Sequence, residues 1–394
     1  MIKKVTGVTI DHIVSLTAFF AATLLFTSLF LQTMNTAIIY QRNHQVALKA
    51  SDVLNNILLS PGSPSDWGQN NGIPSAFGLH QPETSLLSLS SFSLLRLISP
   101  QNVVDYSGTL YGNISVAEGV SVFMPVANYV DYPTVSRLLS VNGSYGFHIL
   151  IEPTLKVSIL QVQQYPLKLK VQVEGPGGAC SGAQVDCSTY YALRSQPNPS
   201  IEFKTSNAFT NATGAAFLEF QTVDASEVSY SAIAQVHLGG LQGTGFYCSP
   251  LSSDSFIKTL VTDYENRTIA LIHRADLLGG DQSAVSYNLT YILPTQNYGF
   301  RSIQIENSTE VVNRGEPAYV QIPSFDVGIL IISYRTTGED FGTIMMPWGV
   351  SSLGMSVDFG IDSSTSSWVA TQLRQVIVEQ ISYQVRLALW SLTG

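Results

Sequence analysis

Residues 13–34 read IVSLTAFFAATLLFTSLFLQTM, an apolar stretch that contains no charged residue. About 20 apolar residues in a helix are enough to cross a bilayer. The apolar region of a cleaved secretory signal is shorter, about 7–15 residues, and no small-x-small cleavage site follows Met34. The stretch therefore predicts a transmembrane helix over residues 13–34 with the lipid bilayer as its surroundings.

The residues on either side of this span predict its orientation. Lys3 and Lys4 lie in the basic segment 1–12, whereas no positive charge follows Met34 before Gln41. Positive charges flanking a span tend to remain in the cytoplasm. We therefore expect a single-pass protein of the cell membrane with a cytoplasmic N-terminus and the bulk of the chain outside.

The helix is predicted to continue beyond the membrane, over residues 35–60. Neither glycine nor proline occurs between Val8 and Ser60, and Pro61-Gly62 then ends the run. Apolar residues recur in this second half at helical spacing, on one side of the helix, at Val46, Ala50, Val53, Leu54, Ile57 and Leu58. Polar residues fall on the other side, at Gln45, Lys49, Asp52 and Asn56.

This N-terminal pattern resembles archaeal type IV pilin-like proteins. MIKKVTG matches the short basic leader that ends in glycine, and the stretch ASDVLNNILLSPGSPSDWG after the helix is similar to surface proteins of this type. The resemblance covers about the first 70 residues. It implies cleavage between Gly7 and Val8 and a long helix that packs against an extracytoplasmic β domain. It also implies copies of the chain, or other pilin-like subunits, as partners.

Asp11 departs from the family pattern and admits a second interpretation. Such pilins usually carry an acid at the fifth position after the cleaved glycine, but Asp11 is fourth and His12 is fifth. The alternative is a plain signal anchor in which Asp11 caps the start of the helix.

The outer part is predicted to be mainly β, in three units. Residues 61–160 form a small α+β unit, in which residues 85–99 are a helix candidate. Residues 161–245 begin with the alternating strand LKLKVQVEG. Residues 246–394 contain many strand-like runs and form a second β-rich domain. Near the C-terminus, SSWVATQLRQVIVEQ is interpreted as a helix and ISYQVRLALW as a final strand.

The middle unit resembles immunoglobulin-like and carboxypeptidase-regulatory-like β-sandwiches. A strand, a variable loop, a turn ending in glycine and a strand with phenylalanine carry this resemblance, at Thr210, Asn211, Gly214 and Phe220. It covers about 80 residues and implies a two-sheet sandwich.

Composition fits an exported protein and argues against several classes of function. Charged residues make up 12% of the chain and the net charge is −9, so no nucleic-acid partner is expected. The histidines show no zinc-ligand spacing and no nucleophile motif appears, so we expect no enzyme, cofactor or metal site. N-glycosylation sequons all follow the anchor, at Asn113, Asn142, Asn211, Asn266, Asn288 and Asn307.

Cys180 and Cys187 lie close together in a glycine-rich loop. In an oxidising compartment their spacing favours a disulfide, with free thiols or a metal site as alternatives. Cys248 is left over.

The sequence thus predicts a membrane-anchored, extracytoplasmic structural or adhesive surface protein, and a pilin-like component of a surface filament. The alternative is a ligand-binding or sensor ectodomain that acts through a membrane partner.

Overall fold

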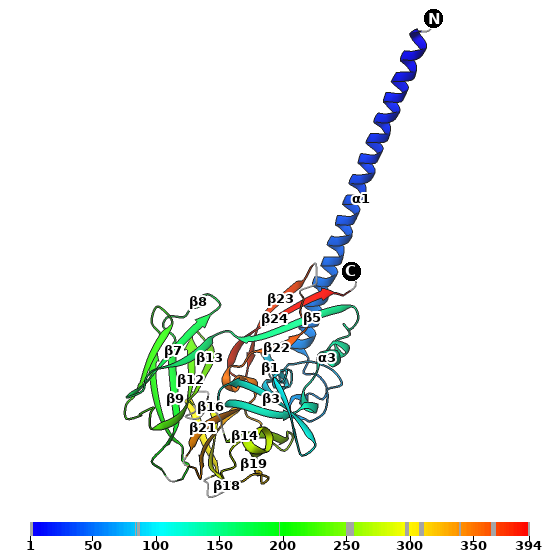
Figure 1. The fold of residues 1–394 in the computed structure, drawn as a ribbon. Helices are drawn as coiled ribbons and strands as arrows, with labels where there is room; N and C mark the ends of the chain where they lie inside the picture. Colours follow the sequence, from blue (N-terminus) through cyan, green and yellow to red (C-terminus); the bar gives the residue numbers. More distant parts are fainter. Residues whose placement is uncertain are drawn as a thin grey trace.

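A long N-terminal helix enters a body of β-sheets (Figure 1). The computed structural model describes residues 3–82, 84, 87–196, 198–249, 256–295, 299–306, 311–338, 340–363 and 368–392, and of residues 3–10 it describes the backbone. Helix α1, Lys3–Leu59, has its N-terminal end far from the β body, and the C-terminus lies near the point where the helix enters that body (Figure 1). The predicted continuous helix and the mainly β class are confirmed.

The second half of α1 packs on a five-stranded sheet through the predicted apolar stripe. Val46, Ala50, Val53, Leu54, Ile57 and Leu58 are all buried. The sheet has the order β1 (Ser88–Leu89), β23 (Ala370–Val378), β24 (Ile381–Ser391), β5 (Tyr145–Pro153), β22 (Val357–Gly360). Helix α1 contacts β23 and β24. The helix is therefore anchored on strands from the far end of the chain.

A two-sheet sandwich forms the part of the body shown in green in Figure 1. One sheet has the order β10 (Glu202–Phe209), β9 (Gln184–Leu193), β12 (Val228–Leu238), β13 (Leu241–Ser249). The other has the order β11 (Ala215–Phe220), β7 (Leu167–Gly175), β6 (Lys156–Gln163), with β8 (Gly178–Ala179) paired to β7. Inward residues of both sheets share one apolar core. The predicted sandwich is confirmed, and LKLKVQVEG forms its alternating strand β7. The sandwich begins with β6, however, so the boundary predicted after residue 160 falls inside that strand.

The largest sheet gathers strands from both sides of the sandwich in sequence. Its main path is β17 (Gly299–Glu306), β16 (Val285–Thr295), β20 (Gly328–Thr336), β21 (Phe341–Trp348), β4 (Val120–Pro125), β14 (Ile257–Asp263), β15 (Thr268–His273), β19 (Ala318–Gln321). Strands β2 (Asn102–Tyr106), β3 (Thr109–Ala117) and β18 (Val311–Val312) join it at the side. The short helices are η1 (Trp67–Gln69), α2 (Ser91–Leu95), η2 (Val126–Asn128), α3 (Tyr132–Leu138), α4 (Arg274–Leu278) and η3 (Val350–Leu353).

These pairings correct the predicted unit boundaries. Strand β4 lies between β21 and β14, and β5 pairs with β24, so residues 61–160 and 246–394 share two sheets. The boundary predicted after residue 245 falls inside β13. Sequence periodicity did not reveal which strands are neighbours, because pairing between distant strands leaves no local pattern.

Two predicted helices are also corrected. In the segment interpreted as a helix before the last strand, Ala370–Val378 is β23, which forms a hairpin with β24 through Glu379 and Gln380. Hydrogen bonding along β24 outweighs the helical pattern there. Within the described residues 87–99 of the second candidate helix, only Ser91–Leu95 is α-helical, with Ser90 as its N-cap. The predicted final strand is confirmed as β24.

Candidate functional site

The first half of α1 exposes large apolar side chains outside the β body. Every residue from Asp11 to Arg42 is exposed, and Ile13, Phe26 and Ile39 are 63%, 72% and 58% exposed. The helix is long and apolar enough to span a membrane. An exposed apolar surface of this length is unfavourable in water, so it requires lipid or other helices around it.

Five threonines between Asp11 and Arg42 form hydrogen bonds within the helix. Each donates a hydrogen bond of 2.8–2.9 Å to the carbonyl oxygen four residues earlier, at Thr17, Thr23, Thr27, Thr33 and Thr36. A hydroxyl without a partner is costly in an apolar medium, whereas a hydroxyl bonded to its own helix is not. These residues are therefore compatible with lipid or with a dry bundle of helices.

Ser28, Gln32 and Asn35 form a polar stripe on one face of the same helix. Their spacing of four and three residues places them above one another. Polar side chains on a membrane helix often hydrogen-bond across to a second helix, each bond contributing about 1 kcal/mol.

The predicted processing residues lie near the far end of α1. Gly7 and Val8 are within the helix, and Asp11 is exposed. Asp11 is therefore available to a lipid headgroup region or to a neighbouring chain. The N-cap role of Asp11 in the alternative interpretation does not fit, because the helix already begins at Lys3.

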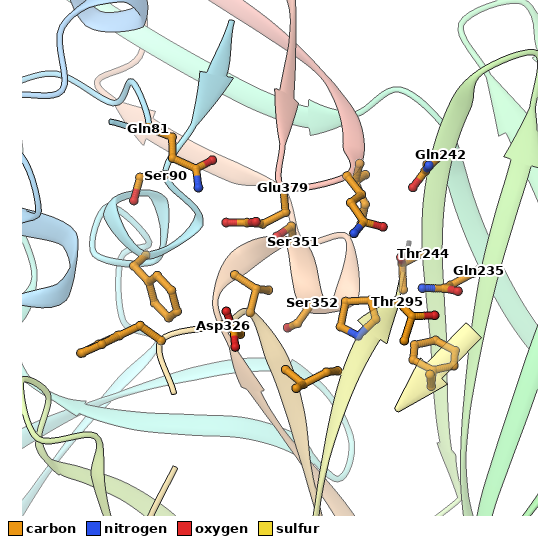
Figure 2. A pocket seen from close by; sticks show the side chains of 18 of the residues that line it. Gln81, Ser90, Gln235, Gln242, Thr244, Thr295, Asp326, Ser351, Ser352 and Glu379 are labelled. Carbon is orange, nitrogen blue, oxygen red and sulfur yellow. The ribbon is translucent and has the colours of Figure 1, made fainter. Parts of the chain in front are cut away.

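A second candidate site is a cavity of about 750 Å³ where the sandwich meets the two other sheets (Figure 2). One side is built by β12 and β13, which contribute Gln235, Gln242 and Thr244. Asp326 and Ser352 come from the loop before β20 and from η3, and Glu379 comes from the β23–β24 turn. Figure 2 shows that Gln81 and Ser90 lie on the side away from the sandwich strands.

Strand periodicity explains why β12 presents polar groups to this cavity. Tyr230, Ala232, Ala234 and Val236 point into the sandwich core. The alternate residues face the rest of the body, so Ser229 and Ser231 meet Thr343 of β21 through their hydroxyl groups at 3.1 and 3.2 Å. Gln235 continues this face beyond that contact, where the sheets diverge.

Two glycines fix which face of strand β13 points toward the cavity. A Cβ atom at Gly243 would lie 2.9 Å from the Leu155 side chain, and one at Gly245 would lie 2.5 Å from the Val157 side chain. Only glycine permits this close approach to the β6 side. The residues between and beside them, including Gln242 and Thr244, therefore face the cavity. In the stretch GGLQGTG, residues 239–245, a turn at Gly239 and Gly240 leads into this strand.

The cavity combines amides and hydroxyls with an excess of acid. Gln235 is 7% exposed, and its Oε1 atom is buried without a hydrogen-bond partner. Glu379 is exposed as a residue, but protein atoms around its carboxylate, together with the charge of Asp326, raise its pKa. Asp66 adds a third acid, and among the described lining residues Arg301 is the one Lys or Arg. Burial lowers the pKa of His237 and so favours its neutral form.

The predicted disulfide is absent. Cys180, Cys187 and Cys248 are all free thiols. Cys187 lies on β9, buried in the sandwich core, where burial raises its pKa to about 12. Cys180 follows β8, which pairs with β7 of the opposite sheet. The two cysteines are close in sequence, but the chain crosses from one sheet to the other between them.

The sequons differ in accessibility. Asn142, Asn211 and Asn266 are exposed in turns, whereas Asn113 is half-buried in β3. Asn288 is 2% exposed in β16. Asn307 lies outside the described residues.

Within the part of the chain that the structure describes, no group of three or more His, Cys, Asp or Glu side chains could hold a metal ion. The cavity residues were not predicted from the sequence. Their only sequence signal was the polar set on alternate positions of β12, which periodicity alone assigns to an exposed face.

No family model and no curated protein matches the chain. Among solved structures, it is similar to trypsin-activated alpha-2-macroglobulin from Escherichia coli, with 11% identity over 57% of this chain and 18% of that one, and a TM-score of 0.21. For Salmonella alpha-2-macroglobulin reacted with methylamine, identity is 13% over 56% of this chain and 17% of that one, with a TM-score of 0.20. The chain thus spans less than a fifth of these proteins. Similarities this low carry no argument about function.

Proposed function

We propose that this chain is a membrane-anchored, extracytoplasmic structural or adhesive surface protein that assembles as a pilin-like subunit of a surface filament. The observation that carries the proposal is the division of α1 into two halves. One half is packed on the β body, and the other presents apolar side chains to its surroundings. A helix of this kind can lie in a bilayer and later in a bundle with copies of itself.

Assembly would use the end of the helix that bears Asp11. Cleavage after Gly7 would create a new amine on Val8 and remove Lys3 and Lys4. When apolar helices pack together, the Asp11 carboxylate would leave water and need a positive partner, which the amine of a neighbouring chain supplies. Removing one partner of such a buried pair typically costs about 3–5 kcal/mol.

The test combines N-terminal sequencing with imaging of the native protein. We expect a mature chain that begins at Val8, and filaments at the cell surface that bind antibodies against the β body. A chain that still begins at Met1 or Ile2, with antibody label dispersed over the membrane, would contradict assembly and favour the plain anchor.

A second candidate is a ligand-binding ectodomain, which the cavity favours. Its volume of about 750 Å³ is within the range of small-molecule sites, about 300–1,000 Å³. In this function, binding of the ligand would be signalled through α1 to a membrane partner. The β23–β24 turn lines the cavity, and the same two strands contact α1. This hairpin would therefore connect a bound ligand to the helix.

A further inference from the structure

We propose that the cavity binds a neutral carbohydrate through Gln235, Thr244, Asp326 and Glu379. This inference rests on the second candidate function, ligand binding by the β body, and is independent of assembly through α1.

Hydrogen-bonding chemistry is the first argument. Each sugar hydroxyl both donates and accepts, and an amide presents a donor and an acceptor side by side. Gln235 and Thr244 are directly opposite one another on β12 and β13 and are 7% and 8% exposed. The Oε1 atom of Gln235 has no partner in the protein, although a buried polar atom without one is costly. A ligand that donates a hydrogen bond would satisfy it.

The charges of the lining select against acidic ligands. Asp66, Asp326 and Glu379 outnumber Arg301, and a phosphate or a sialic acid would meet net repulsion. Ionised carboxylates are strong acceptors with two oxygens each, and they suit adjacent hydroxyl groups of a neutral sugar.

An apolar surface completes the site. Pro294 and Phe300 are directly opposite one another on β16 and β17, and both line the cavity half-buried. The face of an aromatic ring carries partial negative charge and attracts the polarised C–H groups of a sugar ring. A lining that combines amides and hydroxyls with an apolar surface matches a ring with hydroxyls on its rim and C–H bonds on its face.

The experiment uses the full chain in phosphatidylcholine nanodiscs, because detergents with sugar headgroups would compete for the cavity. The protein is produced in a host that adds no glycans, and it is applied to an array of neutral oligosaccharides with their sialylated and sulfated counterparts. Glycans released from the native protein are printed beside foreign ones. Binding to the released glycans shows that the natural ligand is a glycan on another copy of the chain. Binding only to the foreign glycans shows that the ligand belongs to another surface.

We expect binding to neutral oligosaccharides and none to the acidic counterparts. Gln235→Ala and Thr244→Val should each weaken the affinity at least about tenfold, as expected for the loss of one or two hydrogen bonds. Matched controls are Gln375→Ala and Thr371→Val, which are exposed on β23 away from the cavity and should leave binding unchanged.

Hydrogen–deuterium exchange of the unmodified protein gives a readout that needs no variant. A bound oligosaccharide should protect β13 and the turn at Glu379 and Gln380. The proposal is overturned if no neutral glycan binds, if acidic glycans bind equally well, or if protection appears elsewhere. A negative array leaves assembly through α1 standing, and absence of filaments leaves carbohydrate binding standing.

Discussion

At the residue scale, a buried arginine organises the loop that follows α1. Arg96 is fully buried, and its guanidinium lies 5.3 Å from the centre of the Trp67 ring. It donates hydrogen bonds to four backbone carbonyl oxygens. Those of Asn70, Gly72 and Asn128 lie at 2.8, 2.7 and 2.6 Å, and the fourth belongs to Trp67. Burial lowers its pKa, but a guanidinium stays charged. The guanidinium therefore links the loop of residues 67–72 to the segment around Asn128.

Arg96→Lys should lower the free energy of unfolding by about 3 kcal/mol, because an ammonium cannot reach all these carbonyls and a hydrogen bond from a charged donor contributes about 1.5–3 kcal/mol. Urea unfolding followed by tryptophan fluorescence measures the change, since Trp67 lies beside the substitution. Arg386→Lys is the control, exposed on β24, and should change stability by less than about 0.5 kcal/mol. Equal effects of the two substitutions would contradict this role.

Glu379 makes stability depend on pH. Burial of its carboxyl, with the charge of Asp326 nearby, raises its pKa above the usual 4.5. The native state then binds the proton more tightly than the unfolded state. The resulting contribution to stability is fully present below the unfolded pKa and is lost as pH rises through the native pKa.

Glu379→Gln should therefore raise the thermal midpoint at neutral pH and leave it unchanged at pH values below about 4. Thermal unfolding at both pH values measures this difference. Glu174→Gln, exposed on β7, is the control and should not reproduce it. The same gain for Glu379→Gln at both pH values would show that the cause is not titration.

At the scale of elements, α1 is one helix with two environments. Helix formation requires only local hydrogen bonds, and the chain has neither glycine nor proline between Val8 and Ser60 to interrupt them. The two halves differ in packing because the β body covers the helix only from about Val46 onward. Residues 11–42, which include the charge-free stretch, lie outside it. At about 1.5 Å per residue, residues 11–42 extend roughly 50 Å from the body, more than the hydrocarbon thickness of about 30 Å.

Asp11→Ala should block incorporation into filaments and leave membrane insertion intact, because the carboxylate is needed only when it pairs with a neighbouring amine. Asp52→Ala is the matched control, since Asp52 is exposed on the packed half of the same helix. Membrane fractionation measures insertion, and electron microscopy with antibody labelling measures assembly. Filaments formed by the Asp11 variant in normal number would contradict the pairing.

At the scale of the whole molecule, the β body is interleaved. Strands before the sandwich complete sheets formed by strands after it, and α1 packs on β23 and β24. Truncation of the C-terminal hairpin would therefore remove the surface on which α1 packs and expose a buried apolar stripe.

If the β body is exported and glycosylated, the fold should determine which sequons carry sugar. We expect glycans at exposed turns, at Asn142, Asn211 and Asn266, and none at Asn288, whose burial in β16 leaves no room for one. Mass spectrometry of glycopeptides from the native protein measures occupancy at each site. Protease added to intact cells should also digest the β body. Sugar on Asn288, or a β body protected from the protease, would contradict this arrangement.

The sequence by itself determined those elements of this protein that have a clear apolar periodicity. The apolar run of residues 13–34, the stripe from Val46 to Leu58 and the alternating LKLKVQVEG each specify an element through its own periodicity. Tertiary structure alone decided that β4 lies beside β14 and β21, that Ala370–Val378 pairs as a strand, and that Cys180 and Cys187 remain apart. It also placed Gln235, Asp326 and Glu379 around one cavity. Periodicity shows which side of an element is apolar, but the neighbour that covers this side is set by contacts between residues far apart in the chain.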